Sequence, residues 1–126
     1  MAKLCKPSPG PWEVDTVDND GMYGDGPDAH SGFKSYAVYD ANGQALFDSI
    51  NSDAIEVDVE YDEFGAYAWD RVGEANLTLA SASPDMLLAL QEVLKTPGLQ
   101  SGVQAMCAAA VAKATGRDVA DVVKGI

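Results

Sequence analysis

The hydrophobic pattern of this chain changes its period once, near Gly65, and this change limits the folds that the chain can adopt. Before Gly65, apolar and polar residues alternate in short segments, which is typical of half-buried strands. After Gly65, apolar residues recur every three or four positions, which is typical of amphipathic helices. The sequence therefore predicts strands first and helices second, and hence an α+β fold.

About four strands are predicted in the N-terminal part, and we expect them to form an antiparallel meander. Their segments are 11–17, 35–39, 44–49 and 54–61. Asn42-Gly43 lies between the second and third segments, and this pair supplies the positive φ angles that a tight hairpin needs. A stretch rich in Gly, Asp and Pro at 21–32 is predicted to be a long irregular loop.

Three to four helices are predicted in the C-terminal part, packed on one face of the sheet. The first is expected at about 68–82 and the third at about 102–114, with Gly116 as its C-cap. Between them, Ser83-Pro84-Asp85 is a typical helix start, with an N-cap, a proline in the first turn and an early acid. A short fourth helix is expected around 119–126.

The length of 126 residues fits one domain, with an acidic β-rich part at 1–66 and a helical part at 67–126. The two cysteines, Cys5 and Cys107, are far apart and are expected to be free thiols. No apolar run approaches the ~18 residues that span a bilayer, and the basic N-terminus has no apolar segment behind it. We therefore expect a cytoplasmic protein that does not contact a membrane.

The negative charge is confined to one part of the chain. The net charge is −12, and residues 1–74 hold sixteen acids against four bases, whereas residues 75–126 hold four of each. A field of this sign repels nucleic acid and attracts basic protein surfaces. The charge therefore predicts a protein partner with a basic surface and no direct nucleic-acid binding.

The strand at 54–61 carries the densest acidic pattern. Strand period places alternate carboxylates on one face, about 6.6–7 Å apart along the strand. The candidate partner-binding face consists of Glu56, Asp58, Glu60, Asp62 and Glu63. Two interpretations compete with a binding role: a solvated outer face, and charge that keeps an edge strand from self-association.

A second candidate binding cluster follows directly. Aromatic side chains at the junction of strand and helix, with one base beside them, could stack on and hold a ligand. These residues are Phe64, Tyr67, Trp69 and Arg71. Arg71 could hold a carboxylate or a phosphate, or it could pair with the nearby Asp70 or Glu74. The aromatic residues could equally belong to the core.

The sequence offers little for catalysis or metal binding. His30 is the single histidine, and no nucleophile elbow, phosphate loop or dinucleotide motif is present. The segment 16–21 partly resembles a calcium loop, but its first ligand position is Thr16 and its twelfth would be Pro27. We therefore expect no enzyme activity, no catalytic residues, no metal and no cofactor.

Two segments resemble a known group of proteins. Pro9-Gly10-Pro11-Trp12 resembles the PGPW opening of many small proteins encoded in phages and prophages. The segment EANLTLASASPDMLLAL at 74–90 is similar to the helix–proline–helix of the same group, although Ser81 and Ser83 interrupt its usual alanine-rich run. The resemblance implies a phage origin and a β-meander with a helical pair. It implies no activity.

Charge, size and resemblance together predict a non-enzymatic phage protein that inhibits or sequesters a host factor in the bacterial cytoplasm. An anti-CRISPR or other anti-defence protein that covers a basic nucleic-acid-binding site would fit. One alternative is a sponge for a nucleotide signal, in which Arg71, Lys34 and Arg117 converge across a dimer. Another is a phage accessory or structural protein. The many alanines of the third helix also predict a homodimer through the helical part.

Overall fold

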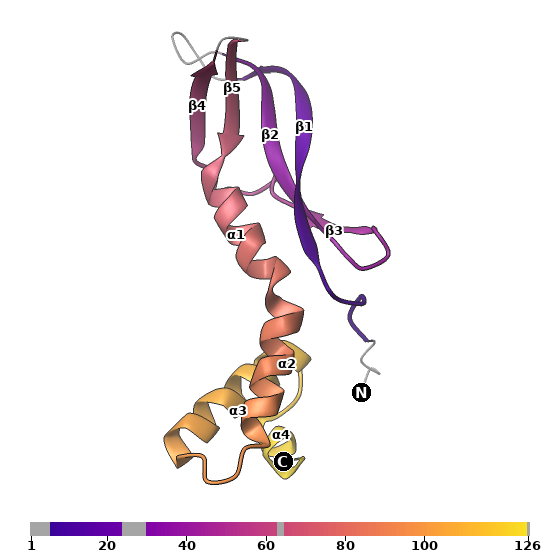
Figure 1. The fold of residues 1–126 in the computed structure, drawn as a ribbon, viewed down its shortest axis with the longest axis vertical. Coiled ribbons are helices and arrows are strands. Elements are labelled where there is room, and N and C mark those ends of the chain that lie inside the picture. The colour runs from indigo at the N-terminus through magenta and orange to yellow at the C-terminus, as the bar shows by residue number, and fades with distance from the viewer. Residues whose placement is uncertain (1–5, 24–29, 63–64, 126) are drawn as a thin grey trace. The chain divides into compact units, whose positions relative to one another are not determined.

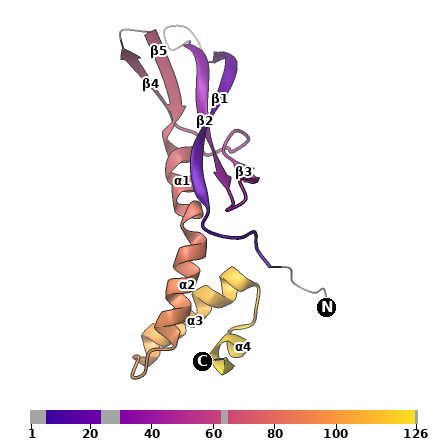
Figure 2. The same cartoon turned by 45° about the vertical axis from the view of Figure 1, so that its right-hand side comes forward.

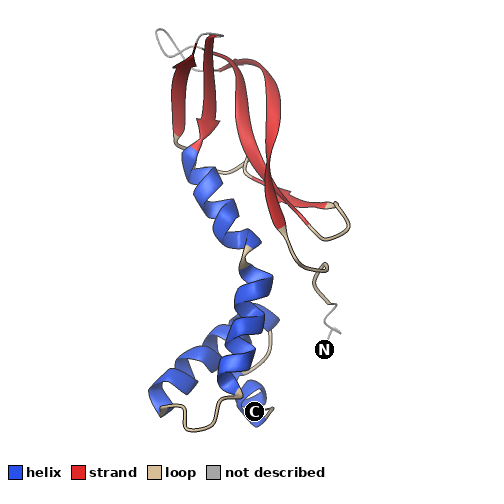
Figure 3. Cartoon of the chain, viewed as in Figure 1, coloured by secondary structure: helices blue, strands red, loops and turns tan. Residues whose placement is uncertain are grey.

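The computed structural model describes residues 6–23, 30–62 and 65–125. Within these ranges the strands precede the helices, so the predicted α+β class is confirmed (Figures 1 and 3). The strands are β1 (Glu13–Tyr23), β2 (His30–Tyr39), β3 (Ala45–Asp48), β4 (Val57–Asp62) and β5 (Gly65–Asp70). The helices are α1 (Arg71–Ser81), α2 (Ser83–Leu94), α3 (Ser101–Thr115) and α4 (Val119–Lys124).

The chain divides into two compact units between Ala82 and Ser83. We call Ser8–Ala82 the sheet unit and Ser83–Ile126 the helical unit; residues 1–7, which carry Lys3 and Lys6, group with the latter but are left out of the charge given for either unit. The sequence placed the change from acidic to helical part at 66/67. The structural boundary comes later because α1 packs on β1, β2 and β4 and so belongs to the sheet unit.

The sheet is mixed, with the order β1-β2-β5-β4 and with β3 paired to β2 (Figure 1). The pairs β1–β2, β2–β3 and β4–β5 are antiparallel, as a meander requires. The contact between β2 and β5 is parallel, through Lys34 and Trp69, so the sheet is not the purely antiparallel one that was expected.

The expected start of the first helix at residue 68 is wrong, because residues 65–70 form β5. The alternation of Ala66 and Ala68 with Tyr67 and Trp69 has the period of a strand. Alanine has a high helix propensity, which obscured this pattern. Pairing with β4 along its whole length holds the segment extended, so tertiary contacts override the local preference.

The predicted loop at 21–32 is wrong at both ends, where the structure has strands instead. β1 continues to Tyr23 and β2 begins at His30, while residues 24–29 lie outside the described part. The β1–β2 register shifts between Asn19 and Met22, so the start of the predicted loop is a bulge in β1. Gly21 has a φ of 114° there, a conformation that favours glycine.

One face of the sheet is covered by α1, as Figure 2 shows. Tyr36, Val38 and Leu77 are buried in this layer. The partly buried side chains around them are Trp12, Val14 and Leu46. Leu77 is the contribution of α1. Three to four helices were expected on this face; α1 packs there, whereas α2, α3 and α4 belong to the helical unit.

The helical unit has a small core of its own. Leu94, Val111 and Val122 are at most 5% exposed, and Ala108 and Ala112 are buried between them. Cys107 packs against this core as a free thiol, while Cys5 lies outside the described residues. The predicted C-cap of α3 is confirmed, since Gly116 has a left-handed φ of 70°. Among the described helices, none has the length and apolar character to span a bilayer.

Candidate acidic binding site

The predicted acidic face lies on β4, which is an outer strand of the sheet. Asp58 and Glu60 are two residues apart on this strand, and their side chains are 53% and 54% exposed. Glu56 directly precedes β4 and is also exposed. Asp62 closes the strand, but its side chain is not described, and Glu63 lies outside the described residues.

The structure brings the acidic and aromatic candidates together in one hairpin. Asp58 is the direct neighbour of Trp69 across the β4–β5 pair, and Glu60 is the neighbour of Tyr67. Direct neighbours in an antiparallel pair have side chains on the same face. Phe64 lies outside the described residues, and of Tyr67 only the backbone is described.

Arg71 connects these residues from the first position of α1. Its Nε lies 2.9 Å from Asp58 Oδ2, and its Nη2 lies 3.7 Å from Glu60 Oε1. Its guanidinium carbon is 4.2 Å from the centre of the Trp69 ring, which is a cation–π distance. The hydrogen bond to Asp58 raises the pKa of Arg71 and so favours the charged form.

These contacts correct two expectations from the sequence. The ion-pair partners of Arg71 are Asp58 and Glu60, not Asp70 or Glu74. Trp69 is only 8% exposed, so its ring is not an open stacking surface for a ligand. Both corrections arise from the β4–β5 pairing, which brings residues more than ten positions apart into contact.

Asp70 positions the site, and the sequence reasoning did not identify it. This side chain is fully buried, and its Oδ1 accepts hydrogen bonds from the backbone N–H groups of Gly73 and Glu56. The backbone N–H of Arg71 in turn donates to the carbonyl oxygen of Glu56 at 2.8 Å. Asp70 is thus the N-cap of α1 and fixes this helix to the start of β4. The N-cap preference for Asp would have indicated it, had the helix start been placed at 71.

Gly73 makes this close arrangement possible. A Cβ atom on Gly73 would lie 2.1 Å from Asp70 Oδ2 and 2.9 Å from the Cβ of Ser49. Both distances are too short for real atoms, so any other residue would displace Asp70 or the first turn of α1. A glycine at the third position of this helix therefore has a packing cause.

Tyr36 and Glu74 form a second contact between sheet and helix. The Tyr36 hydroxyl donates to Glu74 Oε2 at 2.5 Å. Burial and this hydrogen bond to a carboxylate raise the pKa of Tyr36 to about 12. The neutral hydroxyl is therefore the form that the folded sheet unit favours.

Both basic residues of the sheet unit are paired with carboxylates. Besides the pairs of Arg71, Lys34 Nζ lies 3.5 Å from Asp18 Oδ1. By sequence, the sheet unit holds sixteen acids against these two bases, a net charge of −14, whereas the helical unit holds four acids and four bases. Among the residues that the structure describes, no three His, Cys, Asp or Glu side chains gather in a way that could hold a metal ion. The excess of acids over bases in the sheet unit can attract cationic groups of a partner.

Comparison with known proteins identifies a family. The profile of the family described as Salmonella phage P22 protein Y8K6 matches residues 1–118. No curated protein and no solved structure matches the chain.

Proposed function

Because the chain belongs to the family of the Salmonella phage P22 protein Y8K6, we propose that it is a phage protein that acts by binding, without catalysis. Its sheet unit would dock on a basic surface of a host protein. The observation that carries this proposal is the pairing of Lys34 and Arg71 with carboxylates in a unit of net charge −14. Such a unit presents negative charge to a partner, and both cations among its described residues are already paired.

The contact would centre on β4. Glu56, Asp58 and Glu60 are exposed there, on the outer strand that Arg71 and Asp70 fix in place. Rows of Lys and Arg are what a protein uses to bind the phosphates of nucleic acid. A strand of carboxylates presents the same sign of charge as those phosphates, so it suits the role of an inhibitor that occupies a nucleic-acid-binding surface. Anti-CRISPR and other anti-defence proteins are functions of this kind.

Charge complementarity of this type mainly accelerates association and selects the partner. The affinity should therefore fall steeply with salt, because contacts between exposed charges are screened within about 10 Å at 0.1 M ionic strength. Arg71 limits the cost of bringing Asp58 and Glu60 close together before a partner arrives. The same residue keeps Trp69 covered, so the proposed contact is polar.

The test uses three amide substitutions together, Glu56→Gln, Asp58→Asn and Glu60→Gln. Protein captured from host lysate by the unaltered chain at low salt should be released by added duplex DNA, since both would compete for one basic surface. The triple variant should capture at least about tenfold less, a difference of about 1.4 kcal/mol in binding free energy.

The matched control is Asp85→Asn, Glu92→Gln and Asp121→Asn, which changes the charge by the same amount on the helical unit. The control should capture as much as the unaltered chain. Equal capture by the two triple variants would overturn the proposed site. Tryptophan fluorescence verifies folding of the first variant, because Trp69 lies beneath Arg71.

The position of β4 favours one further candidate role for the acidic residues. β4 and β1 are both outer strands of the sheet, and β1 exposes Glu13, Asp15 and Asp18. Charged side chains on outer strands prevent sheets from pairing edge to edge. If the acids serve only this purpose, as in an accessory or structural phage protein, the first triple variant should self-associate and no DNA-displaceable partner should be captured.

The nucleotide-sponge alternative receives less support. Arg71 and Lys34 are already paired with carboxylates, and Arg117 belongs to the helical unit. A phosphate at the sheet unit would have to displace these carboxylates against a strongly negative field.

A further inference from the structure

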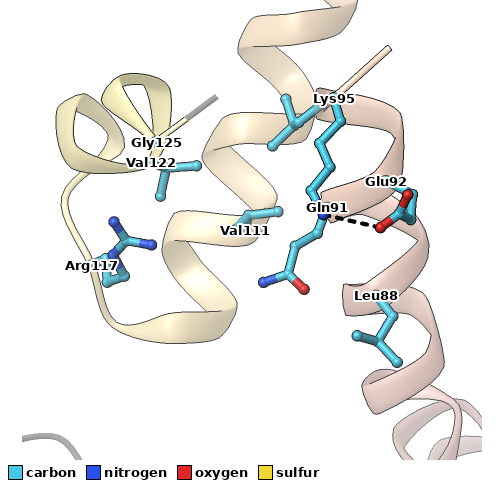
Figure 4. A pocket seen from close by; sticks show the side chains of 9 residues that line it. Leu88, Gln91, Glu92, Lys95, Val111, Arg117, Val122 and Gly125 are labelled. Atoms are coloured by element: carbon cyan, nitrogen blue, oxygen red, sulfur yellow. Dashed lines mark hydrogen bonds and ion pairs between the residues drawn. The ribbon is translucent and has the colours of Figure 1, made fainter.

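A pocket of about 350 Å³ lies within the helical unit, and none of its lining residues belongs to the acidic site (Figure 4). Side chains of α2 and α3, the segment that follows α3, and α4 surround it. The lining residues are Leu88, Gln91, Glu92, Leu94, Lys95, Val111, Arg117, Val122 and Gly125. A volume near the lower end of the usual range for ligand sites suits a small molecule.

The inner wall of the pocket is apolar. Leu94, Val111 and Val122 line it, and all three also belong to the buried core of the unit. Water against these side chains has no hydrogen-bond partner on their side, so an aliphatic group that displaces it gains free energy. The wall therefore favours a ligand with a short hydrocarbon body.

The outer wall carries positive charge. Arg117 and Lys95 line it with the amide of Gln91, and one acid, Glu92, is paired with Lys95 at 3.1 Å. Figure 4 shows Arg117 next to Val122, with Gln91 on the other side of Val111. Two cations against one acid leave a net charge of +1 at this wall, which suits a ligand with one negative charge.

Arg117 differs from the cations of the sheet unit. Lys34 and Arg71 both pair with carboxylates, whereas the hydrogen bond of Arg117 in the described part of the chain runs from Nη2 to the backbone carbonyl oxygen of Asp121 at 3.2 Å. A guanidinium has five N–H donors in a planar fork that matches a carboxylate. Most of the donors of Arg117 are thus available beside the apolar inner wall that Leu94, Val111 and Val122 form.

We propose that this pocket binds a small aliphatic carboxylate, with the carboxylate on Arg117 and the hydrocarbon body against Leu94, Val111 and Val122. Lys95 adds a second, weaker attraction, since it is shared with Glu92. The helical unit has no net charge, so it does not repel an anionic ligand. A site on the negatively charged sheet unit would repel one.

The test compares hexanoate with hexanol, which share the same body and differ in the charged head. Backbone amide shifts of the full ¹⁵N-labelled chain report binding, and the shifting residues should be those that line the pocket. Hexanoate should bind at least about tenfold more tightly than hexanol, because only the charged head accepts charge-assisted hydrogen bonds from Arg117. Equal binding of the two, shifts centred on the sheet unit, or no saturable shift would overturn the proposal. Inorganic phosphate should bind more weakly than hexanoate, and equal binding would overturn the assigned ligand class.

Two variants locate the site. Arg117→Gln should weaken hexanoate binding about tenfold, whereas Lys113→Gln, which removes an exposed cation of α3 outside the pocket, should leave it unchanged. Gly125→Leu should block binding without a change of charge, because Gly125 lines the pocket and a leucine side chain would occupy it. The fold should tolerate this side chain, because Gly125 has a φ of −83° and a Cβ there would meet only carbonyl oxygens at 3.6 and 3.7 Å. An equal loss in the Lys113 and Arg117 variants, or full binding in the Gly125 variant, would show that the pocket is not the site.

Discussion

The two units of this protein use different means to hold their structure. The sheet unit carries all ten aromatic residues and a net charge of −14, and buried polar groups such as Asp70, Ser35 and Ser49 lie among its strands. The helical unit has no aromatic residue and no net charge, and its buried core consists of leucine, valine and alanine. Directional hydrogen bonds therefore fix the geometry of the sheet unit, whereas non-directional apolar packing holds the helical unit together.

This difference explains why the candidate acidic site has a defined geometry. Arg71 can reach Asp58 and Glu60 only if α1 begins where it does and β4 passes beside it. Asp70 secures both conditions with one carboxylate oxygen. The helical unit lacks such a buried polar group among its described residues, so its pocket rests on the packing of three helices.

The composition also allows each unit to be observed separately. Trp12 and Trp69 both belong to the sheet unit, so tryptophan fluorescence follows that unit alone. Cys107 lies half-buried against the helical core, so its rate of modification follows the helical unit once Cys5 is replaced by Ser. The predictions below use these two probes.

The largest effect is expected for Gly73→Ala. The added methyl group cannot coexist with Asp70 Oδ2 at 2.1 Å, so either the N-cap bond or the first turn of α1 must give way. We expect a loss of about 4 kcal/mol in the stability of the sheet unit, from strain plus the lost cap. Urea unfolding followed by tryptophan fluorescence measures this loss.

The control for Gly73→Ala is Gly102→Ala in α3, where a Cβ would have nothing within 4 Å. This substitution should stabilise the helical unit by about 0.5–1 kcal/mol, because alanine favours a helix more than glycine does. Similar destabilisation by both substitutions would show that the contact of Gly73 with Asp70 is not the cause.

Leu94→Ala should destabilise the helical unit by about 3 kcal/mol. Leu94 is 5% exposed and is the largest side chain of a core whose other members are valine and alanine. Modification of Cys107 should accelerate, while tryptophan fluorescence stays unchanged. Leu88→Ala, at a side chain that is 61% exposed, should change stability by less than about 0.5 kcal/mol. A fall in the fluorescence midpoint for Leu94→Ala would mean that the two units unfold together.

Alkaline pH should destabilise the sheet unit through Tyr36. The pKa of this hydroxyl is raised from 10.0 to about 12 in the folded state, so the folded state favours the neutral form. The neutral Tyr36 hydroxyl therefore contributes fully to the stability of the sheet unit below pH 10, and this contribution is lost as the pH rises through about 12. Over this window the sheet unit should lose about 2 kcal/mol.

Tyr36→Phe removes the titrating hydroxyl, so its stability should change less between pH 10 and 12 than that of the unaltered chain. Tyr39→Phe removes a hydroxyl from the same strand and serves as the matched control. If both variants keep the full alkaline loss, the contact between Tyr36 and Glu74 does not cause it.

Added salt should produce the smallest difference in stability between the two units. Raising NaCl from about 50 mM to about 500 mM should stabilise the sheet unit by about 1 kcal/mol, because screening weakens the repulsion among its carboxylates. The neutral helical unit should change by less than about 0.3 kcal/mol under the same conditions. Equal responses of the two probes would contradict the division of charge between the units.

Much of the fold could be predicted because its signals are local. The hairpin at Asn42-Gly43, the helix start near Pro84 and the C-cap at Gly116 each depend on a few neighbouring residues, and each occurs where it was expected. Residues 68–70 were assigned wrongly to a helix, because the short alternation of residues 65–70 competes with the high helix propensity of alanine. Only pairing with β4 and β2 resolves that competition.

The candidate site was predictable in its residues but not in its contacts. The acids of β4 and the cluster around Arg71 were both identified, yet as separate features. Their union depends on the register that sets Asp58 beside Trp69, and register is a property of the paired strands. The roles of Asp70 as N-cap and of Gly73 beside it were not predicted, because they arise only where the end of β5, the start of α1 and the segment before β4 meet.

By itself, the sequence determined the order of strands and helices and the confinement of negative charge to the first part of the chain, because periodicity and composition are local properties. Only the tertiary structure decided that β5 lies parallel to β2, that Arg71 pairs with Asp58 and Glu60, and that Arg117 lines a pocket together with residues of α2 and α3. These features join residues that are distant in the chain, and the free energy that selects them arises from packing and pairing across the whole unit.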